Sequence, residues 1–390
     1  MSTDVSSRQL FVVTFTGDSG LTDYAVSFCR KSGLRRATTL VTSSAIDPQL
    51  ASGPFAVLQL FRRSRHYPID IVKFTRLWFR YRLSSDFIFQ GPLKFPLLES
   101  LLVRFMRQLG ARCAVVVHDV VPHYRRPFGP FIYKIYYRSF SARVFHTGSA
   151  KSAIDASNSK FAENSVVVPH GNYDIFNTKS LTRETARAVL NLPAGSNRLV
   201  VLSFGNIEDR KGIHELLDAH VELTNSGVDP ITIIAGKRMF DSSSRLAITL
   251  KSDHLPDDVV LADYRIPFDQ VQNYFSACDV VVLPYREGST SGVLKLAMAF
   301  GKPVVAAPVG DLRFEVNGDL GILMKENWDA SELAQSIATI NERLGTFSEL
   351  VRVESAKYGW TEIVDKVVSL LDSGVVGDKP ADGDGASATR

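Results

Sequence analysis

The sequence of 390 residues predicts an α/β protein with two doubly wound parallel sheets. Segments with strand-like and helix-like patterns alternate along most of the chain. The strand-like segments of the second half are continuous apolar runs, which are typical of parallel sheets covered by helices on both faces. The chain is also longer than the ~250–300 residues that one hydrophobic core usually serves, so we expect two domains.

The first half alternates strands with helices that end at a glycine. We expect helices at residues 21–33 and 95–110. The second of these helices has an apolar face made of Leu98, Leu101, Leu102, Phe105 and Leu109. The strands expected in this half are residues 10–17, 87–91, 113–123, 142–148 and 165–171.

The second half repeats this alternation with longer apolar runs. Its expected helices are residues 212–227, 267–278, 293–300 and 331–345. Its expected strands are residues 198–206, 231–237, 259–264, 279–285 and 303–308. Each of these strands is short and bounded by turn residues, as a parallel strand between crossover helices should be.

Changes in composition place the domain boundaries. The N-terminal domain is expected to span residues 1–172, followed by a linker at 173–197 in which polar and turn residues interrupt the strands. The C-terminal domain is expected at 198–355, and a closing helix at 356–372 is expected to pack back on the N-terminal domain. Residues 373–390 are rich in Gly, Asp and Ala, and we expect them to be disordered.

Composition and charge exclude several classes of protein. With 45% hydrophobic and 22% charged residues and no apolar run of ~18 residues, the chain is predicted to be globular and not membrane-spanning. The N-terminus does not have the pattern of a signal peptide, and the three cysteines lie far apart, so we expect a cytoplasmic protein. Residues 1–175 hold 23 Lys and Arg against 11 Asp and Glu, whereas the remainder holds 22 against 30. The basic first half should favour an anionic surface, unless its arginines form a solvated face.

The most informative turn joins a strand to a helix and is nearly free of bulky side chains. Backbone N–H groups at the helix start, from Ser291 to Leu294, can bind a phosphate with the help of the helix dipole. The carboxylate of Glu287 would be unfavourable beside an anion unless it accepts hydrogen bonds from ligand hydroxyls, as a sugar would supply. The alternative is an ordinary helix cap with a solvated glutamate. The turn consists of Glu287, Gly288, Ser289, Thr290, Ser291 and Gly292.

A second turn carries two cations. Gly205 ends a strand, and Arg210 and Lys211 precede a helix that begins near Gly212. Cations beside a helix N-terminus oppose the helix dipole, so their position makes more sense with an anion such as a diphosphate between them. An exposed basic turn is the alternative interpretation.

Three further strand ends carry candidate residues. Gly17 and Gly20 flank a turn that is either a phosphate contact or a plain tight turn. His118 follows a buried strand and can donate to a ligand oxygen or carry a proton, although a structural bond to the backbone is as common. His170 ends another strand at the presumed domain junction.

Other chemistries fit the sequence poorly. It has no Gly-x-Ser-x-Gly elbow, no His-Glu-x-x-His motif, no cysteine pair with zinc spacing and no Walker-type loop. The two expected domains also lack an Asp-x-Asp run that would hold a metal ion on nucleotide phosphates. We therefore expect no metal and no cofactor, with cations and helix dipoles neutralising the phosphates.

With these turns in place, the chain from about residue 10 to 370 resembles the retaining GT-B glycosyltransferases of the glycogen-synthase-like group, which have two Rossmann-like domains facing a central cleft. Lys211-Gly212 matches the second half of that family's diphosphate-binding turn, and Asn206 stands at the usual Arg position. Glu287 matches the first glutamate of the family's paired-glutamate motif, but Lys295 stands at the second, which usually holds the nucleotide ribose.

The resemblance implies transfer of a sugar from a nucleotide-diphosphate donor to an acceptor hydroxyl, with retained configuration and without an obligatory metal. Lys211 would stabilise the leaving diphosphate, and His118 and Glu287 would orient the sugar. These three are the candidate catalytic residues. The candidate donor-binding residues are Gly17, Gly20, Gly205, Asn206, Arg210, Lys211, Gly288, Ser289, Thr290, Ser291, Gly292, Val293, Leu294 and Lys295.

In such enzymes the N-terminal domain holds the acceptor, which we expect to be a saccharide, a lipid-linked saccharide or a glycolipid in polysaccharide biosynthesis. Segments 73–83 and 125–145 interleave aromatic residues with Arg and Lys, which suits peripheral contact with an anionic membrane surface. The alternative is that Ile132, Tyr136 and Phe140 are the buried face of a helix. A nucleic-acid partner is not expected, because no such binding motif is present.

Two other functions compete with this interpretation. A non-catalytic sugar-nucleotide-binding or scaffold subunit would explain the departures at Asn206 and Lys295. An epimerase or a phosphorylase is disfavoured, because the sequence shows neither paired acid and base residues nor a pyridoxal-phosphate lysine setting.

Overall fold

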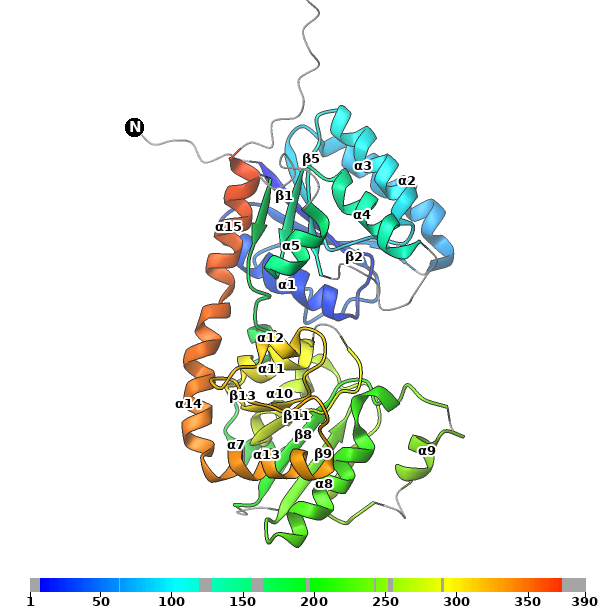
Figure 1. Cartoon of the computed structure of the whole chain (residues 1–390). Helices are drawn as coiled ribbons and strands as arrows, with labels where there is room; N and C mark the ends of the chain where they lie inside the picture. Colours follow the sequence, from blue (N-terminus) through cyan, green and yellow to red (C-terminus); the bar gives the residue numbers. More distant parts are fainter. Residues whose placement is uncertain are drawn as a thin grey trace, which may run out of the picture. The chain divides into compact units, whose positions relative to one another are not determined.

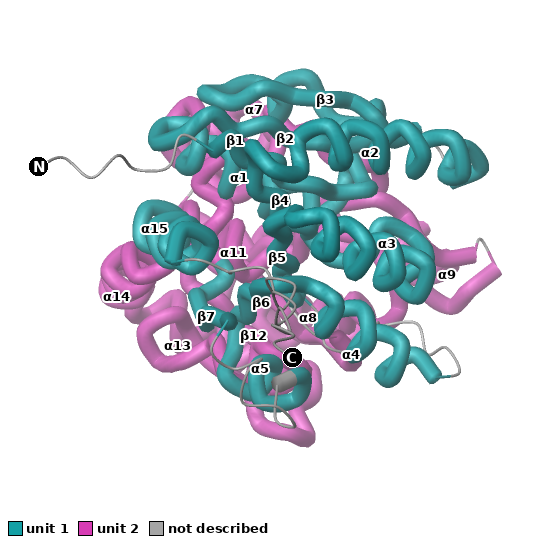
Figure 2. The backbone as a smooth tube through the Cα atoms, turned by 90° about the horizontal axis from the view of Figure 1, so that it is seen from above, with its two compact units in different colours: residues 1–170, 360–390 teal, residues 171–359 magenta. Residues whose placement is uncertain are grey.

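The protein is described here by a computed structural model, in which the chain forms two compact units. Unit 1 comprises residues 1–170 and 360–390, and unit 2 comprises residues 171–359 (Figure 2). The predicted α/β fold with two parallel sheets is confirmed. The expected disordered tail lies outside the described residues, except for Ser373. The structure describes residues 8–62, 64–118, 128–155, 164–193, 197–241, 243–251, 255–288 and 291–373.

The described part of unit 1 is built on a parallel sheet in the order β3-β2-β1-β4-β5-β6-β7 (Figure 1). Its strands are β1 (Gln9–Val13), β2 (Thr38–Ser43), β3 (Ala56–Phe61), β4 (Ser85–Phe89), β5 (Arg112–Val117), β6 (Ala142–Phe145) and β7 (Ser165–Val167). Its helices are α1 (Gly20–Ser32), η1 (Ser64–His66), α2 (Tyr67–Tyr81), α3 (Pro96–Gln108), α4 (Gly129–Ser139), α5 (Gly148–Asp155) and α15 (Trp360–Asp372).

Helices cover both faces of this sheet. On one face lie α2, α3 and α4 (Figure 1). They form an aromatic core with the strands, in which Phe11 stacks on Phe87 and Phe74 contacts Trp78. On the other face α1 packs against α15, and the ring of Trp360 lies edge-on to that of Tyr24. The β4 and β5 strands are almost wholly buried and end in apolar runs, as the central strands of a doubly wound sheet should.

The last described helix, α15, belongs to unit 1 although it follows unit 2 in the sequence (Figure 2). Arg35 forms an ion pair with Asp365, and Arg36 with Asp372. These bonds join the end of α1 to α15, so the chain leaves unit 1 after His170 and returns to it at Trp360.

The apolar face predicted for α3 is present, but most of it is exposed to solvent. Leu98, Leu101 and Phe105 are 55%, 65% and 55% exposed, whereas the face on the core includes Val103 and Met106. An apolar helix face normally packs on a core. This helix therefore has more apolar surface than its own unit buries.

The aromatic residues of segments 73–83 and 125–145 are mostly structural. Phe74 and Trp78 of α2 are fully buried, and Tyr136 and Phe140 are nearly so. The Tyr136 hydroxyl donates to the carbonyl of Gly91 at 2.9 Å. The interpretation of Tyr136 and Phe140 as part of a buried helix face is thus confirmed. The aromatic pattern does not in itself indicate a membrane surface.

The described part of unit 2 is built on a second parallel sheet, in the order β10-β9-β8-β11-β12-β13 (Figure 1). Its strands are β8 (Leu199–Phe204), β9 (Pro230–Ala235), β10 (Val259–Ala262), β11 (Val280–Leu283), β12 (Val304–Ala306) and β13 (Gly321–Leu323). Its helices are η2 (Asp174–Phe176), α7 (Arg183–Val189), η3 (Asp209–Lys211), α8 (Ile213–Asn225), α9 (Arg245–Thr249), α10 (Phe268–Ala277), α11 (Gly292–Ala299), α12 (Leu312–Glu315), α13 (Ala330–Glu342), α14 (Leu344–Ser355) and η5 (Ala356–Tyr358).

The residues expected to form a linker include α7, which is an integral part of unit 2. The buried carboxylate of Asp279 accepts hydrogen bonds from Arg183 at 2.9 Å and from Arg187 at 2.7 Å, both on α7. It also accepts one from the backbone N–H of Val200. The hydrogen bonds from these two arginines to one buried carboxylate hold α7 against the start of the sheet.

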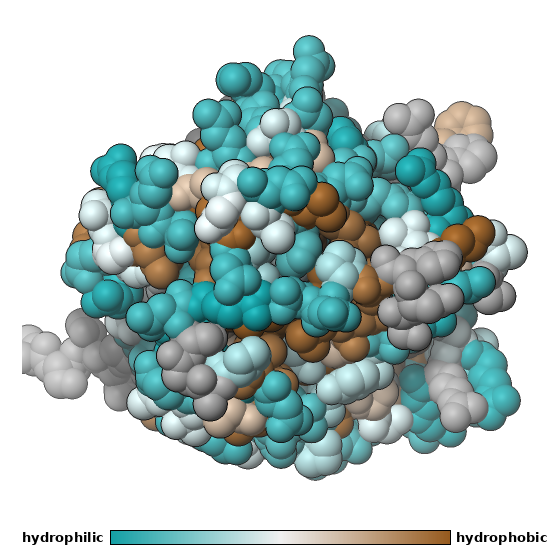
Figure 3. Space-filling view, turned by 90° about the horizontal axis from the view of Figure 1, so that it is seen from below, coloured by the Kyte–Doolittle hydropathy of each residue, from teal (hydrophilic) through white to brown (hydrophobic). Residues whose placement is uncertain are grey.

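The surface of the described chain is mixed in polarity. Figure 3 shows one face, on which hydrophilic side chains predominate and apolar side chains lie between them. None of the described helices combines the length and the apolar character that crossing a membrane requires. Cys29, Cys113 and Cys278 are buried, and each is a free thiol.

Candidate functional site

The turn after β8 and the turn after β11 lie against each other in unit 2. Gly212 has φ of 66°, and a Cβ atom added to it would lie 1.9 Å from the carbonyl oxygen of Pro284. The backbone N–H of Arg286 donates to the carbonyl of Arg210 at 2.8 Å. Only glycine fits such a close approach at this φ, which explains the Lys-Gly pair at the start of α8.

The two predicted cations lie at this junction. The Lys211 ammonium lies 3.6 Å from the ring centroid of Tyr285, a cation–π contact. Arg210 donates to the carbonyl of Glu287 at 3.2 Å and to the carboxylate of Glu208 at 2.7 Å. The structure thus brings Arg210 and Lys211 to the turn that contains Tyr285 and Glu287, more than seventy positions later in the sequence.

Further candidates lie beside them. Gly205 has φ of 102°, and a Cβ atom added to it would lie 3.5 Å from a methyl group of Val293 in α11. A Cβ atom added to Gly288 would lie 3.7 Å from the guanidinium of Arg210. Asn206 is exposed directly after Gly205. These residues form one exposed, backbone-rich area at the carboxyl ends of β8 and β11, where parallel sheets bind ligands.

The start of α11 has the helix cap that the alternative interpretation of the small-residue turn expects. Ser291 is 4% exposed, and its hydroxyl accepts from the N–H of Leu294, so it is the helix N-cap. This bond occupies one of the amides predicted to bind phosphate. Gly292 lies close to the ring of Tyr173. Ser289 and Thr290 lie outside the described residues.

Leu294 and Lys295, both predicted to bind the donor, have fully buried side chains. Leu294 is fully buried in unit 2. Lys295 is fully buried too, and its ammonium lies 2.6 Å from Oε1 of Glu315 on α12 and 5.2 Å from the ring centroid of Tyr358. Their side chains therefore face the interior of the unit, and Lys295 is engaged in an ion pair there.

Gly17 and Gly20 lie in unit 1, in the turn between β1 and α1, and not in this area of unit 2. A Cβ atom added to Gly17 would lie 2.5 Å from the backbone nitrogen of Ile46, so its packing alone requires glycine. The hydroxyls of Thr16 and Ser19 are 2.6 Å apart in the same turn. This local bonding supports the interpretation of a plain tight turn.

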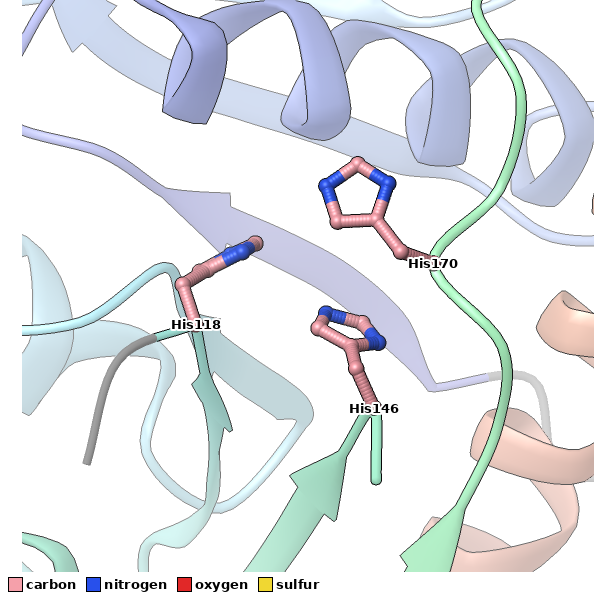
Figure 4. Close-up of side chains that lie close together, drawn as sticks. All are labelled: His118, His146 and His170. Carbon is pink, nitrogen blue, oxygen red and sulfur yellow. The ribbon is translucent and has the colours of Figure 1, made fainter. Parts of the chain in front are cut away.

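His118 is also in unit 1, where it meets two more histidines (Figure 4). His118, His146 and His170 follow β5, β6 and β7, which are neighbours in the sheet. Nε2 of His118 lies 3.0 Å from Oε1 of Gln90, and Nδ1 of His146 lies 3.2 Å from the carbonyl of Val168. Burial, and then the charge on His146, lower the pKa of His118 well below its ordinary value, so the ring is neutral at pH 7.

His146 is the residue that sequence reasoning missed. Its ring centroid lies 5.2 Å from that of His118 and 5.0 Å from that of His170. The ring of Tyr24 lies within 5.2 Å of all three imidazoles, centroid to centroid. The sequence does show that each histidine comes directly or shortly after an expected strand. It does not show that β5, β6 and β7 are neighbours in the sheet, and this adjacency is what brings the three histidines together.

Comparison with known proteins finds a family that resembles this part of the chain. Residues 198–342, which run from β8 to the end of α13, match the family described as Glycosyl transferases group 1. This segment is similar to the group 1 glycosyl transferases. The matched segment contains both turns of unit 2, from Gly205 to Gly212 and from Glu287 to Lys295.

A curated relative is similar over a longer stretch. D-inositol 3-phosphate glycosyltransferase of Mycolicibacterium smegmatis is 29% identical over 227 residues, which cover 56% of this chain and 50% of the relative. The chain thus spans about half the length of the curated relatives it matches.

Solved structures show that the fold is GT-B. Anabaena HepE in complex with UDP and glucose has a TM-score of 0.69 at 18% identity, covering 94% of this chain and 100% of that one. WaaG, a glycosyltransferase involved in lipopolysaccharide biosynthesis, has a TM-score of 0.64 at 14% identity, covering 94% of this chain and 100% of WaaG.

Proposed function

We propose that the protein is a retaining glycosyltransferase that moves a sugar from a nucleotide-diphosphate donor to an acceptor hydroxyl. The observation that carries this proposal is the junction of the two unit 2 turns, where Arg210 lies beside the backbone of Glu287 and Gly288 and the Lys211 ammonium lies over the ring of Tyr285. The match to the group 1 glycosyl transferases covers this junction. The UDP and glucose bound to HepE, which shares the fold, support a nucleotide-sugar donor.

The proposed chemistry follows from the charges at the junction. Lys211 and Arg210, with the N–H groups at the start of α11, would stabilise the negative charge that develops on the leaving diphosphate. Because these groups neutralise the phosphates, a divalent ion on the diphosphate is not required. The exposed carboxylate of Glu287 would accept hydrogen bonds from sugar hydroxyls. The leaving phosphate would take the acceptor proton, so the step needs no protein base.

Donor binding and transfer can be measured separately. A thermal-shift screen against UDP, GDP, ADP and their sugar conjugates should find one nucleotide that raises the melting temperature of the full chain, because a ligand of the native state stabilises it. Lys211→Ala should weaken binding of that nucleotide by about tenfold or more, since a charge-assisted hydrogen bond contributes about 1.5–3 kcal/mol. Glu287→Ala should reduce transfer more than nucleotide binding.

Matched controls are available in the same unit. Lys251 and Glu342 are exposed and lie away from both turns in the sequence, so Lys251→Ala and Glu342→Ala should leave binding and transfer unchanged. If Lys211→Ala binds the nucleotide as tightly as the wild type, the proposed diphosphate site is wrong. If the wild type binds the nucleotide and releases no sugar to water or to any acceptor, the alternative of a non-catalytic sugar-nucleotide-binding or scaffold subunit is favoured. The burial of Lys295, at the usual position of the ribose-binding glutamate, supports that alternative.

We further propose that the acceptor is lipid-linked and that unit 1 binds an anionic membrane surface through α2 and α3. Of the 21 exposed large apolar residues among the described ones, eleven lie between residues 69 and 131. We call the outer side of the two helices the α2–α3 surface. It consists of Ile69, Val72, Lys73, Arg76, Phe79, Arg80, Leu83, Leu97, Leu98, Leu101, Arg104 and Phe105.

The two helices form one continuous surface because they lie side by side. The Tyr67 hydroxyl at the start of α2 donates to Glu99 in the first turn of α3 at 2.7 Å. At the other end, a Cβ atom added to Gly110 would lie 2.8 Å from a methyl group of Leu83. Contacts at both ends align the helices in parallel (Figure 1).

The charge of this surface has one sign. The acidic residues of α2 and α3 are Asp70 and Glu99, and both are buried. Asp70 is paired with Arg62, and Glu99 accepts from Tyr67 and from backbone N–H groups. The exposed charges of both helices are therefore basic, while apolar side chains lie between them. Apolar groups that enter the lipid interface beside cations that meet anionic headgroups are the requirements for peripheral binding.

Vesicle co-sedimentation tests this proposal directly. The full chain should sediment with vesicles that contain anionic lipid, and binding should weaken as salt increases, because the Debye length falls to about 3 Å at 1 M. Vesicles of zwitterionic lipid alone should bind less. Absence of salt-sensitive binding to the anionic vesicles would contradict the membrane proposal and leave the proposal of sugar transfer untouched.

A further inference from the structure

We propose that His118, His146 and His170 bind a divalent transition metal ion in unit 1, with Zn²⁺ as the best fit. One ring nitrogen from each histidine lies within 4.8 Å of the others. Figure 4 shows the three rings grouped around one small space, each carried by a different segment of the chain. Three imidazoles are a ligand set that suits Zn²⁺, and they leave a fourth position for a water or another oxygen ligand.

The sheet explains why these residues converge. β5, β6 and β7 are parallel neighbours, so their carboxyl ends meet at one edge. His118 and His146 directly follow β5 and β6, and His170 comes three positions after β7. This edge of a doubly wound sheet is where ligands bind. The metal site is built from residues of unit 1, whereas the proposed nucleotide site is built from residues of unit 2, so the two proposals rest on different residues.

Hydrogen bonds indicate the tautomers of His118 and His146. Oε1 of Gln90 is an acceptor, so Nε2 of His118 donates to it and the lone pair remains on Nδ1. The carbonyl of Val168 accepts from Nδ1 of His146, so the lone pair remains on Nε2. A ligand histidine typically donates its other ring N–H to a carbonyl or carboxylate in this way. Gln90 is 2% exposed, so the arrangement of His118 is fixed inside the unit.

Aromatic rings from α1 and α15 pack against the cluster. The ring of Tyr24 lies within 5.2 Å of each imidazole, centroid to centroid, and Trp360 of α15 packs on Tyr24. The Tyr24 hydroxyl is buried and has no hydrogen-bond partner among the described residues. A buried hydroxyl without a protein partner is rare and points to a bound water or ion nearby.

The change needed for binding is small. Zn–N bonds of about 2.0–2.1 Å place the nitrogens of a tetrahedral site roughly 3.4 Å apart. Metal binding would therefore draw the rings together by about an ångström, which side-chain rotation can supply. His118 would then act as a metal ligand, in place of the direct sugar contact expected from the sequence.

The test is metal binding by the full chain after treatment with a chelator. Titration with Zn²⁺ should give one equivalent per chain, and Co²⁺ should give the intense visible absorption of a tetrahedral site. His146→Ala and the less disruptive His146→Gln should each weaken Zn²⁺ binding at least tenfold. Gln90→Leu, which removes the acceptor for His118, should weaken it by about tenfold to a hundredfold. The control His214→Ala, on α8 of unit 2, should bind Zn²⁺ as the wild type does.

The same samples separate this proposal from the proposed transferase function. Lys211→Ala should lose nucleotide binding and keep Zn²⁺ binding, and His146→Gln should do the reverse. Circular dichroism and thermal melting confirm that each variant is folded. Binding of less than one tenth of an equivalent, or equal affinities for wild type, His146→Gln and Gln90→Leu, would overturn the metal site whatever the nucleotide results are.

Discussion

The ammonium of Lys295 on α11 lies 2.6 Å from a carboxylate oxygen of Glu315 on α12. The lysine side chain is fully buried, whereas the glutamate side chain is 17% exposed. Removing one partner of a buried pair leaves an uncompensated charge, and the cost depends on whether water can reach that charge. The two partners of this pair are therefore not equivalent.

We predict that Glu315→Ala destabilises the protein by about 3–5 kcal/mol, because it leaves the Lys295 ammonium buried without its partner. Lys295→Met should cost less, because Glu315 is partly exposed and can be hydrated. Unfolding of the full chain in urea, monitored by tryptophan fluorescence, measures the loss of stability in both variants. The exposed pair of Lys366 and Glu362 on α15 is the control, and Lys366→Ala should change stability by less than about 1 kcal/mol. A greater loss for Lys295→Met than for Glu315→Ala would contradict the prediction.

The pair of Lys295 and Glu315 also illustrates what could not be predicted from the sequence. The sequence identified Lys295 as a departure from the resembled family, but Glu315 lies twenty positions later and follows another strand. The partner of a buried charge depends on how two helices pack, and no local pattern in the chain specifies this. The meeting of His118 with His146 has the same origin, because it depends on strand order.

The elements with one dominant pattern were predicted well. Continuous apolar strands such as β5 and β11 are recognisable because both of their faces are buried. β2 is equally buried, but four of its six residues are Ser or Thr, and it was not predicted. The exposed apolar side of α3 could not be foreseen either, because the pattern defines an apolar face and not what covers it.

The close contact between Gly212 and Pro284 gives a second prediction. Gly212→Ala would place a Cβ atom 1.9 Å from the Pro284 carbonyl oxygen at a φ of 66°, so the two turns must separate. We expect a loss of stability well above the roughly 1 kcal/mol that alanine costs at a positive φ in open space. Gly227 is the matched control, because it has φ of 87° and nothing within 4 Å of an added Cβ. Equal thermal shifts for Gly212→Ala and Gly227→Ala would show that the close contact is unimportant.

A third prediction concerns pH and His220 in unit 2. His220 is 4% exposed, and its Nδ1 lies 3.0 Å from the hydroxyl of Thr232. Burial lowers the pKa of His220 below the ordinary value of about 6.5, so the unfolded state binds a proton at a higher pH than the folded state does. The stability contributed by the neutral ring is present above pH ~6.5 and is lost as the pH falls below that value.

Unfolding by urea at pH 7.5, 6.5 and 5.5 tests this direction, with a chelator present to exclude effects of bound metal. The free energy of unfolding of the wild-type protein should fall as the pH is lowered. It should fall less in His220→Gln, because that variant lacks the imidazole that titrates. His214→Gln is the control for a histidine on the same helix. A pH dependence in His220→Gln as steep as that of the wild type would show that another group is responsible.

The α2–α3 surface gives a fourth prediction, which separates its apolar and basic parts. Leu101 and Phe105 are more than half exposed, so Leu101→Ser with Phe105→Ser should leave the fold intact and weaken vesicle binding at every salt concentration. Arg76→Gln with Arg80→Gln should weaken binding to anionic vesicles at low salt by about 2 kcal/mol, or roughly thirtyfold, and should reduce the salt dependence.

The two double variants should weaken vesicle binding in different ways, because apolar contact and electrostatic attraction act over different distances. Apolar contact requires insertion into the interface and is insensitive to screening, whereas attraction of arginine to anionic headgroups decays within a Debye length. Val221→Ser on α8 is the control, since Val221 is an exposed apolar residue of unit 2 and should not contribute. If both double variants bind as the wild type does, the membrane does not contact α2 and α3, and the membrane proposal is wrong.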